Sequence, residues 1–345
     1  MQESQSRSLD SDIAWLLRSP DPSIRYYALA ELVDQPPDAL ELDAAKRLLL
    51  KGPRYRALLE GQRSDGGFGV HPYQKWTGAH WRLVSLIELG APAGYRPAVK
   101  ATNLVLKWLL GEAHLSNVPQ INGLYRRCAS QEGNALAVCS RLGMGEDLRV
   151  RRLAEHLAKW QWPDGGWNCD RKPDAHHSSF NESLPPLWGL VEFHKATGDA
   201  NARESAEKAA EFFLKHRIFR SCRTDQERQP ETFHGKIFRG VHRFTELHYP
   251  PYWHYDFLQA LIVLQRAGKI GDPRTREAID LLESKRGKDG LWRAEGYYWS
   301  LKRKTGAKLA VSNVEIVDWG RNGPNEMITL NALRILKEAR HLESN

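Results

Sequence analysis

The chain of 345 residues carries 50 Lys and Arg against 42 Asp and Glu, and 41 % of its residues are hydrophobic. This composition is typical of a globular protein and excludes a disordered or fibrous chain. No apolar run approaches the roughly 18–20 residues that span a bilayer, and residues 1–12 lack the features of a secretory signal. We therefore expect a cytoplasmic protein without a transmembrane segment. Peripheral contact with a membrane and the oligomeric state stay open.

The net charge of +8 favours anionic partners. The basic residues are scattered, however, and the sequence has no nucleic-acid motif, so we expect a solvated mixed-charge surface and no nucleic-acid partner. Four cysteines are too few for a disulfide framework in a chain of this length, and a reducing compartment would keep them as thiols or metal ligands. They are Cys128, Cys139, Cys169 and Cys222.

A repeated turn motif organises the chain. Residues 62–68 (QRSDGGF) and 161–167 (QWPDGGW) share a glutamine, three residues, a glycine, any residue and an aromatic residue. Residues 123–125 and 290–292 carry only the last part of the motif. Each copy lies between two segments with helical apolar periodicity. We therefore expect the turn to end one helix and the aromatic residue to anchor the link to the next.

The periodic segments predict five helical hairpins. The outer helices are expected at residues 40–61, 96–112, 147–161, 200–217 and 273–286. The inner helices are expected at residues 77–90, 128–142, 178–197, 251–268 and 324–341.

Three segments fall outside this pattern. Residues 12–33 predict a short helical pair similar to a HEAT repeat. The β-branched run at residues 309–317 predicts an irregular insertion or a hairpin arm, and residues 220–251 predict a long loop over a cavity. The sequence thus predicts an all-α chain, with a HEAT-like cap at residues 1–36 and the hairpin repeats at residues 37–345.

The motif at residues 161–167 resembles the QW motif of squalene/hopene cyclases, whose superfamily includes the β-subunits of protein prenyltransferases. The resemblance covers roughly residues 40–341. It implies an α/α barrel, or toroid, of about five hairpins that binds an apolar or isoprenoid molecule in a central cavity. The run Gly-Gly-Trp-Asn-Cys followed by His-Ser-Ser-Phe, at residues 165–180, looks like that of bacterial prenyltransferase-like or terpene-cyclase-like proteins.

The chain departs from both families in the motifs that carry their chemistry. It has neither the Asp-x-Asp-Asp motif of class II cyclases nor an Asp-Asp-x-x-Asp motif for metal-bound diphosphate. In the prenyltransferase β-subunits an Asp, a Cys and a His hold zinc. His177 and His254 match the positions of that Cys and that His, and Ala175 replaces the Asp.

Two cysteines and two histidines are candidate zinc ligands. The starts of inner helices in an α/α barrel converge on one mouth, where Cys128, Cys169, His177 and His254 would offer two thiolates and two imidazoles. His176 is a competing ligand. The alternative is that these are ordinary buried cysteines and hydrogen-bonded histidines.

A set of acids is predicted at the same mouth. Glu182 and Asp256 occupy equivalent repeat positions and are, with His177, the candidate catalytic residues. Glu132 falls one residue away from that position, and His80 and Glu326 lie near the starts of their helices. The alternative is that the acids only complement the helix macrodipole.

Aromatic residues at the inner-helix starts and in the loops are candidate ligand contacts. Their rings could line an apolar pocket and stabilise a carbocation, or they could simply fill the core. Basic residues of the long loop could hold a diphosphate. The ligand contacts predicted in this way are Trp81, Trp188, Trp253 and Tyr255 for the apolar part, and Arg220, Arg223, Arg239 and Arg243 for the diphosphate; His80, Glu132 and Glu326 are added from the acid set.

Two functions therefore stay open. The first is an enzyme of isoprenoid chemistry, of the prenyl-transfer or terpenoid-cyclisation type, with or without zinc. The second is a non-catalytic lipid-binding or interaction protein on the same fold, with a structural zinc or none. A third, a HEAT-like scaffold for protein partners, requires an open solenoid, whereas the Gly-Gly-aromatic turns favour a closed toroid.

Overall fold

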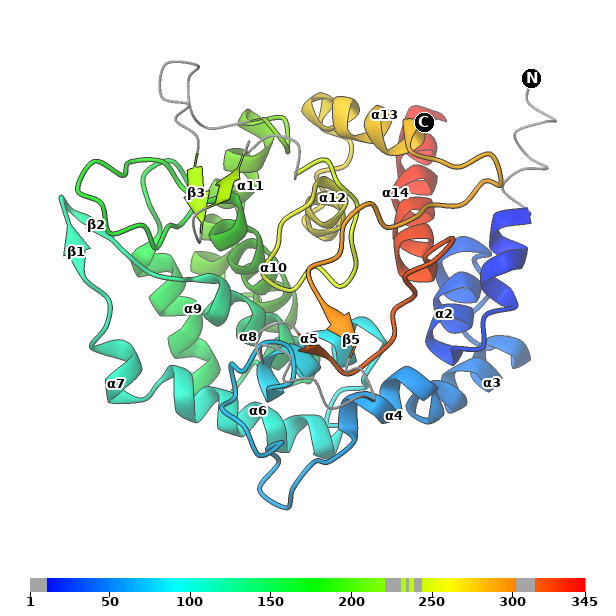
Figure 1. Cartoon of the computed structure of the whole chain (residues 1–345), viewed down its shortest axis with the longest axis horizontal. Helices are drawn as coiled ribbons and strands as arrows, with labels where there is room; N and C mark the ends of the chain where they lie inside the picture. Colours follow the sequence, from blue (N-terminus) through cyan, green and yellow to red (C-terminus); the bar gives the residue numbers. More distant parts are fainter. Residues whose placement is uncertain (1–10, 221–230, 234–235, 239–243, 302–313, 345) are drawn as a thin grey trace.

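In the computed structural model, residues 11–220, 231–233, 236–238, 244–301 and 314–344 are described. Helices dominate these residues, and the strands form only three two-stranded ladders (Figure 1). The all-α class predicted from the sequence is thereby confirmed. None of the helices in the described residues has the length and apolar character needed to cross a bilayer.

The helices of the first half follow a helical segment at residues 11–17. They are α2 (Pro22–Tyr27), the π-helical turn η1 (Ala28–Leu32), α3 (Leu40–Leu48), the 3₁₀ turn η2 (Leu49–Lys51), α4 (Pro53–Leu59), α5 (Ala79–Glu88), α6 (Arg96–Leu109), α7 (Glu112–Leu115), α8 (Ser130–Arg141) and α9 (Leu148–Trp160). The second half contains α10 (Phe180–Thr197), α11 (Ala200–Lys215), α12 (Phe257–Arg266), the 3₁₀ turn η3 (Pro273–Thr275), α13 (Arg276–Ser284) and α14 (Glu326–Ser344).

The strands are short and lie in the loops. β1 (Gln120–Ile121) pairs antiparallel with β2 (Leu124–Tyr125), and β3 (Glu231–Phe233) pairs antiparallel with β4 (Lys236–Phe238). β5 (Ser300–Leu301) pairs in parallel with β6 (Val314–Glu315). The loop predicted at residues 220–251 is described only in part, because residues 221–230, 234–235 and 239–243 lie outside the described residues, as do residues 309–313 of the β-branched run.

The predicted helix boundaries agree with the structure to within three residues except at two places. The first outer helix is divided, because Pro53 has no N–H to continue the pattern, and α4 starts there. The last but one inner helix starts at Phe257 instead of residue 251. Tyr252 has a φ of 48°, outside the right-handed helical region, and Asp256 caps α12 by accepting the N–H of Gln259 at 2.8 Å.

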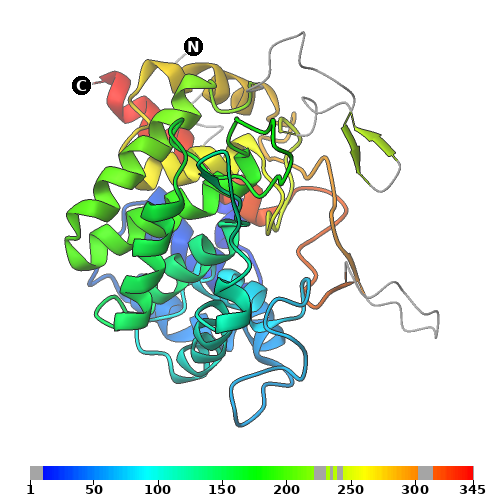
Figure 2. The ribbon, with the colours of Figure 1, turned by 90° about the vertical axis from the view of Figure 1, so that its left-hand side faces the viewer.

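The inner helices contact one another in chain order. α5 packs on α8, α8 on α10, α10 on α12 and α12 on α14, and α14 packs on α2 and η1. α6 packs on α5 and α8, α9 on α8 and α10, α11 on α10, and α13 on α12 and α14 (Figures 1 and 2). One continuous cluster of buried apolar side chains joins these helices.

The repeated glutamine has the same structural role in both copies of the turn motif. Gln62 Nε2 donates to the carbonyls of Gly66 (3.0 Å) and Pro97 (2.9 Å). Gln161 Nε2 donates to those of Gly165 (2.8 Å) and Ser205 (2.9 Å). Each glutamine thus ties its own turn to the following outer helix.

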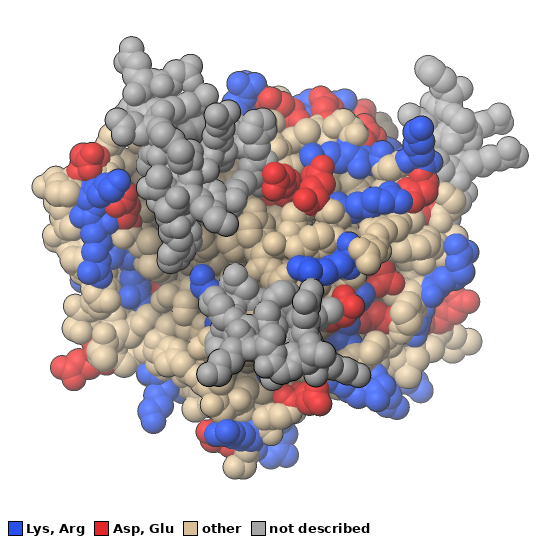
Figure 3. Space-filling model, in the orientation of Figure 1, with Lys and Arg blue, Asp and Glu red and all other residues tan. Residues whose placement is uncertain are grey.

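Charged side chains are interspersed on the surface. On the face shown in Figure 3, Lys and Arg alternate with Asp and Glu on the part that is not covered by grey atoms. Exposed pairs such as Arg149 with Asp147 (2.6 Å) and Lys208 with Glu204 (2.7 Å) illustrate the pattern. This distribution is that of a solvated mixed-charge surface.

Helices α8 and α10 approach each other closely. A Cβ added to Gly133 on α8 would overlap backbone atoms of Pro185 and Pro186, which lie inside α10. Gly189 on α10 faces the Gly133 carbonyl in the same way. The two backbones are therefore in contact, and no side chain fits between them.

We predict that Gly133→Ala destabilises the protein. In an open helix position this change would raise the free energy of unfolding by roughly 0.5–1 kcal/mol, but the overlap with α10 reverses the sign and costs about 1–3 kcal/mol. Urea unfolding followed by circular dichroism measures the effect. Gly271→Ala is the control, since its nearest neighbour is one flexible atom of Leu342 at 3.5 Å. Equal stability of the two variants would contradict the close approach.

Candidate functional site

Two thiols and one carboxylate converge where α8 and α10 begin. Cys128 lies two residues before α8, Cys169 follows the turn motif at residues 161–167, and Glu182 is in the first turn of α10. One ligand atom of each residue lies within 4.8 Å of those of the other two. Among the described residues these three form a group that could hold a metal ion. The close packing of α8 on α10 places them together.

Hydrogen bonds fix the carboxylate of Glu182. Its Oε2 accepts the backbone N–H of Ser130 at 3.0 Å, so the start of α8 holds the first turn of α10. Its Oε1 accepts the indole N–H of Trp253 at 2.8 Å and lies 3.8 Å from the sulfur of Cys169. Glu182 is 1 % exposed. The carboxylate is therefore positioned by three separate segments.

Two acidic groups of the cluster, Cys169 and Glu182, have raised pKa values. A hydrogen bond with Cys128 and burial raise the pKa of the Cys169 thiol above its ordinary value. Burial also raises the pKa of Glu182, against the opposing hydrogen bonds from Trp253 and Ser130. A cation would bind these groups in their deprotonated forms, so its affinity would increase with pH.

Lys75 brings a positive charge to the edge of the cluster. Its Nζ lies 5.5 Å from the ring centroids of both Trp76 and Trp253. Burial lowers the pKa of Lys75, while the negative charges of Cys128 and Glu182 oppose that shift. Lys75 was not predicted from the sequence as a site residue. The signal that could have identified it is a lysine followed by tryptophan just before an inner helix.

A second set of buried polar side chains, centred on Glu132, lies beside the cluster around Glu182. Glu132, 0 % exposed, accepts hydrogen bonds from Arg127 Nε (3.0 Å) and Nη2, and its Oε1 lies 3.0 Å from His114 Nε2. Burial raises the pKa of Glu132 to about 7, although Arg127 opposes the shift. Burial lowers the pKa of both His114 and His80 to about 3, so both rings are neutral. Arg127 and His114 are further residues that the sequence analysis did not identify.

Two predicted acids have structural partners elsewhere. Asp256, besides capping α12, lies 3.1 Å from His248 Nδ1 and accepts the His248 backbone N–H at 3.2 Å. Glu326 at the start of α14 forms an ion pair with Arg54 at 2.6 Å. Both acids belong to helix starts, as the alternative interpretation of the acid set proposed, and neither joins the cluster around Glu182.

The two histidines predicted as zinc ligands are not members of the group of three. His254 lies before α12, where its ring stacks on Tyr298 with 3.7 Å between centroids. The ring of His177 lies 4.0 Å from that of His176, in the loop before α10. From the predicted ligand set the structure therefore brings together Cys128 and Cys169. It adds Glu182, which the sequence had suggested as a catalytic acid or base.

The predicted aromatic contacts divide between two places. Trp188, Trp253 and Tyr255 line a mainly apolar cavity of ≈ 50 Å³ between α10, α12 and residues 249–255. Trp81 lies outside that lining and packs edge-on against Trp76, with 4.8 Å between ring centroids. Trp253 connects this cavity to the cluster around Glu182. Its ring lines the cavity, and its indole N–H donates a hydrogen bond to Glu182.

Two further predicted residues lie in other surroundings. Arg220 forms an exposed ion pair with Glu277 at 2.8 Å, and Cys139 is buried in the last turn of α8. Four others lie outside the described residues: Cys222, Arg223, Arg239 and Arg243.

Comparison with models of known protein families, with curated proteins and with solved structures gives no match.

Proposed function

We propose that the chain is an enzyme of isoprenoid chemistry, of the prenyl-transfer or terpenoid-cyclisation type, with zinc held by Cys128, Cys169 and Glu182. The scaffold in this proposal is an α/α toroid, and the ordered contacts from α5 to α14 and on to α2 support it. A single observation carries the function. The three ligand atoms lie within 4.8 Å of one another, and one of the three residues, Glu182, accepts the indole N–H of Trp253, whose ring lines an aromatic cavity.

The donor set suits zinc. Thiolate and carboxylate groups are ordinary zinc ligands, and three protein ligands leave the fourth tetrahedral position open, as in catalytic sites. Zinc held in this way would lower the pKa of a thiol or water bound at the open position. The protein supplies the remaining features. Trp253 orients Glu182, and the ammonium of Lys75 would stabilise negative charge that develops beside the thiols.

The aromatic cavity supports an apolar substrate. Its lining includes the aromatic rings of Trp188, Trp253 and Tyr255 and the aliphatic side chains of Leu184 and Val263. Such rings stabilise a cationic carbon through their π faces and exclude water from it. The allylic cations of isoprenoid chemistry require both this stabilisation and the exclusion of water.

A second candidate, a non-catalytic binding protein, is favoured by the size of the same cavity. A volume of ≈ 50 Å³ is far below the roughly 300–1,000 Å³ of pockets that hold small organic ligands. Residues 249–255 line one side of this narrow cavity, and Tyr252 contacts Glu315 through its hydroxyl. An isoprenoid chain would enter only if this segment moved, so the enzyme proposal includes that movement.

We predict about one zinc per chain in the purified protein, measured by inductively coupled plasma mass spectrometry after dialysis. Cys128→Ser, Cys169→Ser and Glu182→Gln each remove a ligand and should lower zinc retention at least about tenfold. Cys139→Ala removes a buried thiol outside the group and is the control. His177→Ala and His254→Ala should retain the metal. Wild-type protein that is folded and metal-free would contradict the proposed zinc site.

The isoprenoid part is tested by binding. A farnesyl analogue titrated into the zinc-loaded protein should quench tryptophan fluorescence, because Trp188 and Trp253 line the cavity. Leu184→Trp fills the cavity and should weaken binding at least about tenfold, whereas Leu148→Trp makes the same change at a 76 % exposed position and should not. Zinc-loaded protein that binds no isoprenoid would favour the non-catalytic candidate.

A further inference from the structure

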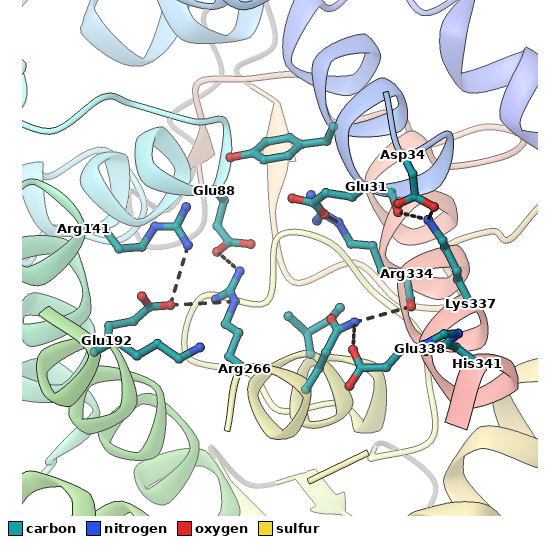
Figure 4. A pocket seen from close by; sticks show the side chains of 14 residues that line it. Glu31, Asp34, Glu88, Arg141, Glu192, Arg266, Arg334, Lys337, Glu338 and His341 are labelled. Carbon is teal, nitrogen blue, oxygen red and sulfur yellow. Dashed lines mark hydrogen bonds and ion pairs between the residues drawn. The ribbon is translucent and has the colours of Figure 1, made fainter. Parts of the chain in front are cut away.

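A second, larger hollow lies at the other end of the inner helices. Its volume is ≈ 630 Å³, and residues near the C-terminal ends of α5, α8, α10, α12 and α14, together with η1, line it (Figure 4). Glu192 in this hollow and Glu182 in the thiol cluster are ten residues apart on α10, which is about 15 Å along a helix. The hollow is therefore separate from the candidate metal site.

The side of the hollow formed by α5, α8, α10 and α12 is a network of ion pairs. Arg266 binds Glu88 at 2.9 Å and lies 3.9 Å from Glu192, which is also 3.6 Å from Arg141 (Figure 4). The guanidinium of Arg266 lies 5.1 Å from the ring centroid of Trp188. Arg266 and Glu88 also line the aromatic cavity, so this pair separates the two hollows.

The side formed by η1 and α14 is paired in the same manner. Arg334 binds Glu31, and Lys337 binds Asp34 at 2.5 Å (Figure 4). In total, five Lys or Arg and five Asp or Glu side chains line the hollow, so their formal charges cancel. A simple polyanion or polycation gains nothing from a lining of this composition.

Two charged side chains in the lining of the hollow, Lys195 and Glu338, take no part in these ion pairs. Lys195 on α10 forms no ion pair with any residue that the structure describes. Glu338 on α14 accepts a hydrogen bond from the neutral amide of Gln265 at 2.7 Å, and in the same described part of the chain it has no cationic partner. One ammonium and one carboxylate are thus available to a ligand, on two different helices.

The spacing of these helices indicates the shape of the ligand. α12 contacts both α10 and α14, and neighbouring helix axes lie about 8–10 Å apart. The two charges therefore face the hollow from helices that are not neighbours. A short peptide extends roughly 3.3–3.6 Å per residue, so its two terminal charges lie farther apart than the adjacent charges of a free amino acid.

We propose that this hollow is a binding site for a small zwitterion of the short-peptide class, with its carboxylate at Lys195 and its ammonium at Glu338. The volume of ≈ 630 Å³ falls within the roughly 300–1,000 Å³ range of small-molecule sites. The ion-pair network around Arg266 and Arg334 holds the walls in place. The proposal does not depend on the metal site or on isoprenoid chemistry.

Isothermal titration calorimetry with trialanine tests the proposal. The zwitterion should bind roughly fivefold more tightly than either N-acetyl-trialanine or trialanine amide, each of which lacks one charge. Lys195→Gln should abolish the preference over the amide only, and Glu338→Gln the preference over the N-acetyl form only. This crossed pattern distinguishes recognition of the two termini from a general loss of stability.

Lys208→Gln is the matched control, because it removes an exposed lysine on α11 and should leave both preferences unchanged. Thermal melts establish that each variant is folded. Absence of trialanine binding to the wild type, or preferences that persist in both Lys195→Gln and Glu338→Gln, would overturn the proposal. Zinc content is measured on the same samples and stays constant if the two sites are independent.

Discussion

The contact of α8 with α10 is the constraint on which the candidate site depends. Gly133 and Gly189 allow the two backbones to touch, and Pro185 and Pro186 form the opposing surface. At this separation the N–H of Ser130 reaches Glu182, so the start of one helix is bonded to the first turn of the other. The cysteines that flank these starts are thereby brought to the same point. A small change in helix separation would disperse all three ligand groups.

The same helices present different chemistry at their two ends. At the starts, Glu182 lies in a first turn, where the macrodipole favours an acid, and burial raises the pKa of its carboxyl group. At the ends, Arg141 and Arg266 lie in last turns, where the macrodipole favours cations. The Arg266–Glu88 pair separates the two regions. This polarity keeps a thiol site and a charged hollow apart within one chain.

The sequence predicts the helices well because the turn motif marks where they end. Glutamine, glycine and aromatic residues recur at fixed spacing, and their hydrogen bonds in the structure repeat with them. The site was predicted less completely. Glu182 and Asp256 occupy equivalent repeat positions, yet only Glu182 meets the thiols, because α12 begins late and uses Asp256 as its cap. Lys75 was missed because its position depends on a loop without periodicity.

The central claim is that Cys128, Cys169 and Glu182 bind zinc with one position open. X-ray absorption at the zinc edge of the protein as isolated tests it most directly. The account predicts two sulfur ligands at about 2.3 Å and the remaining ligands as oxygen at about 2.0–2.2 Å. A spectrum with four sulfur ligands, or with the multiple-scattering pattern of two imidazoles and no sulfur, would contradict it.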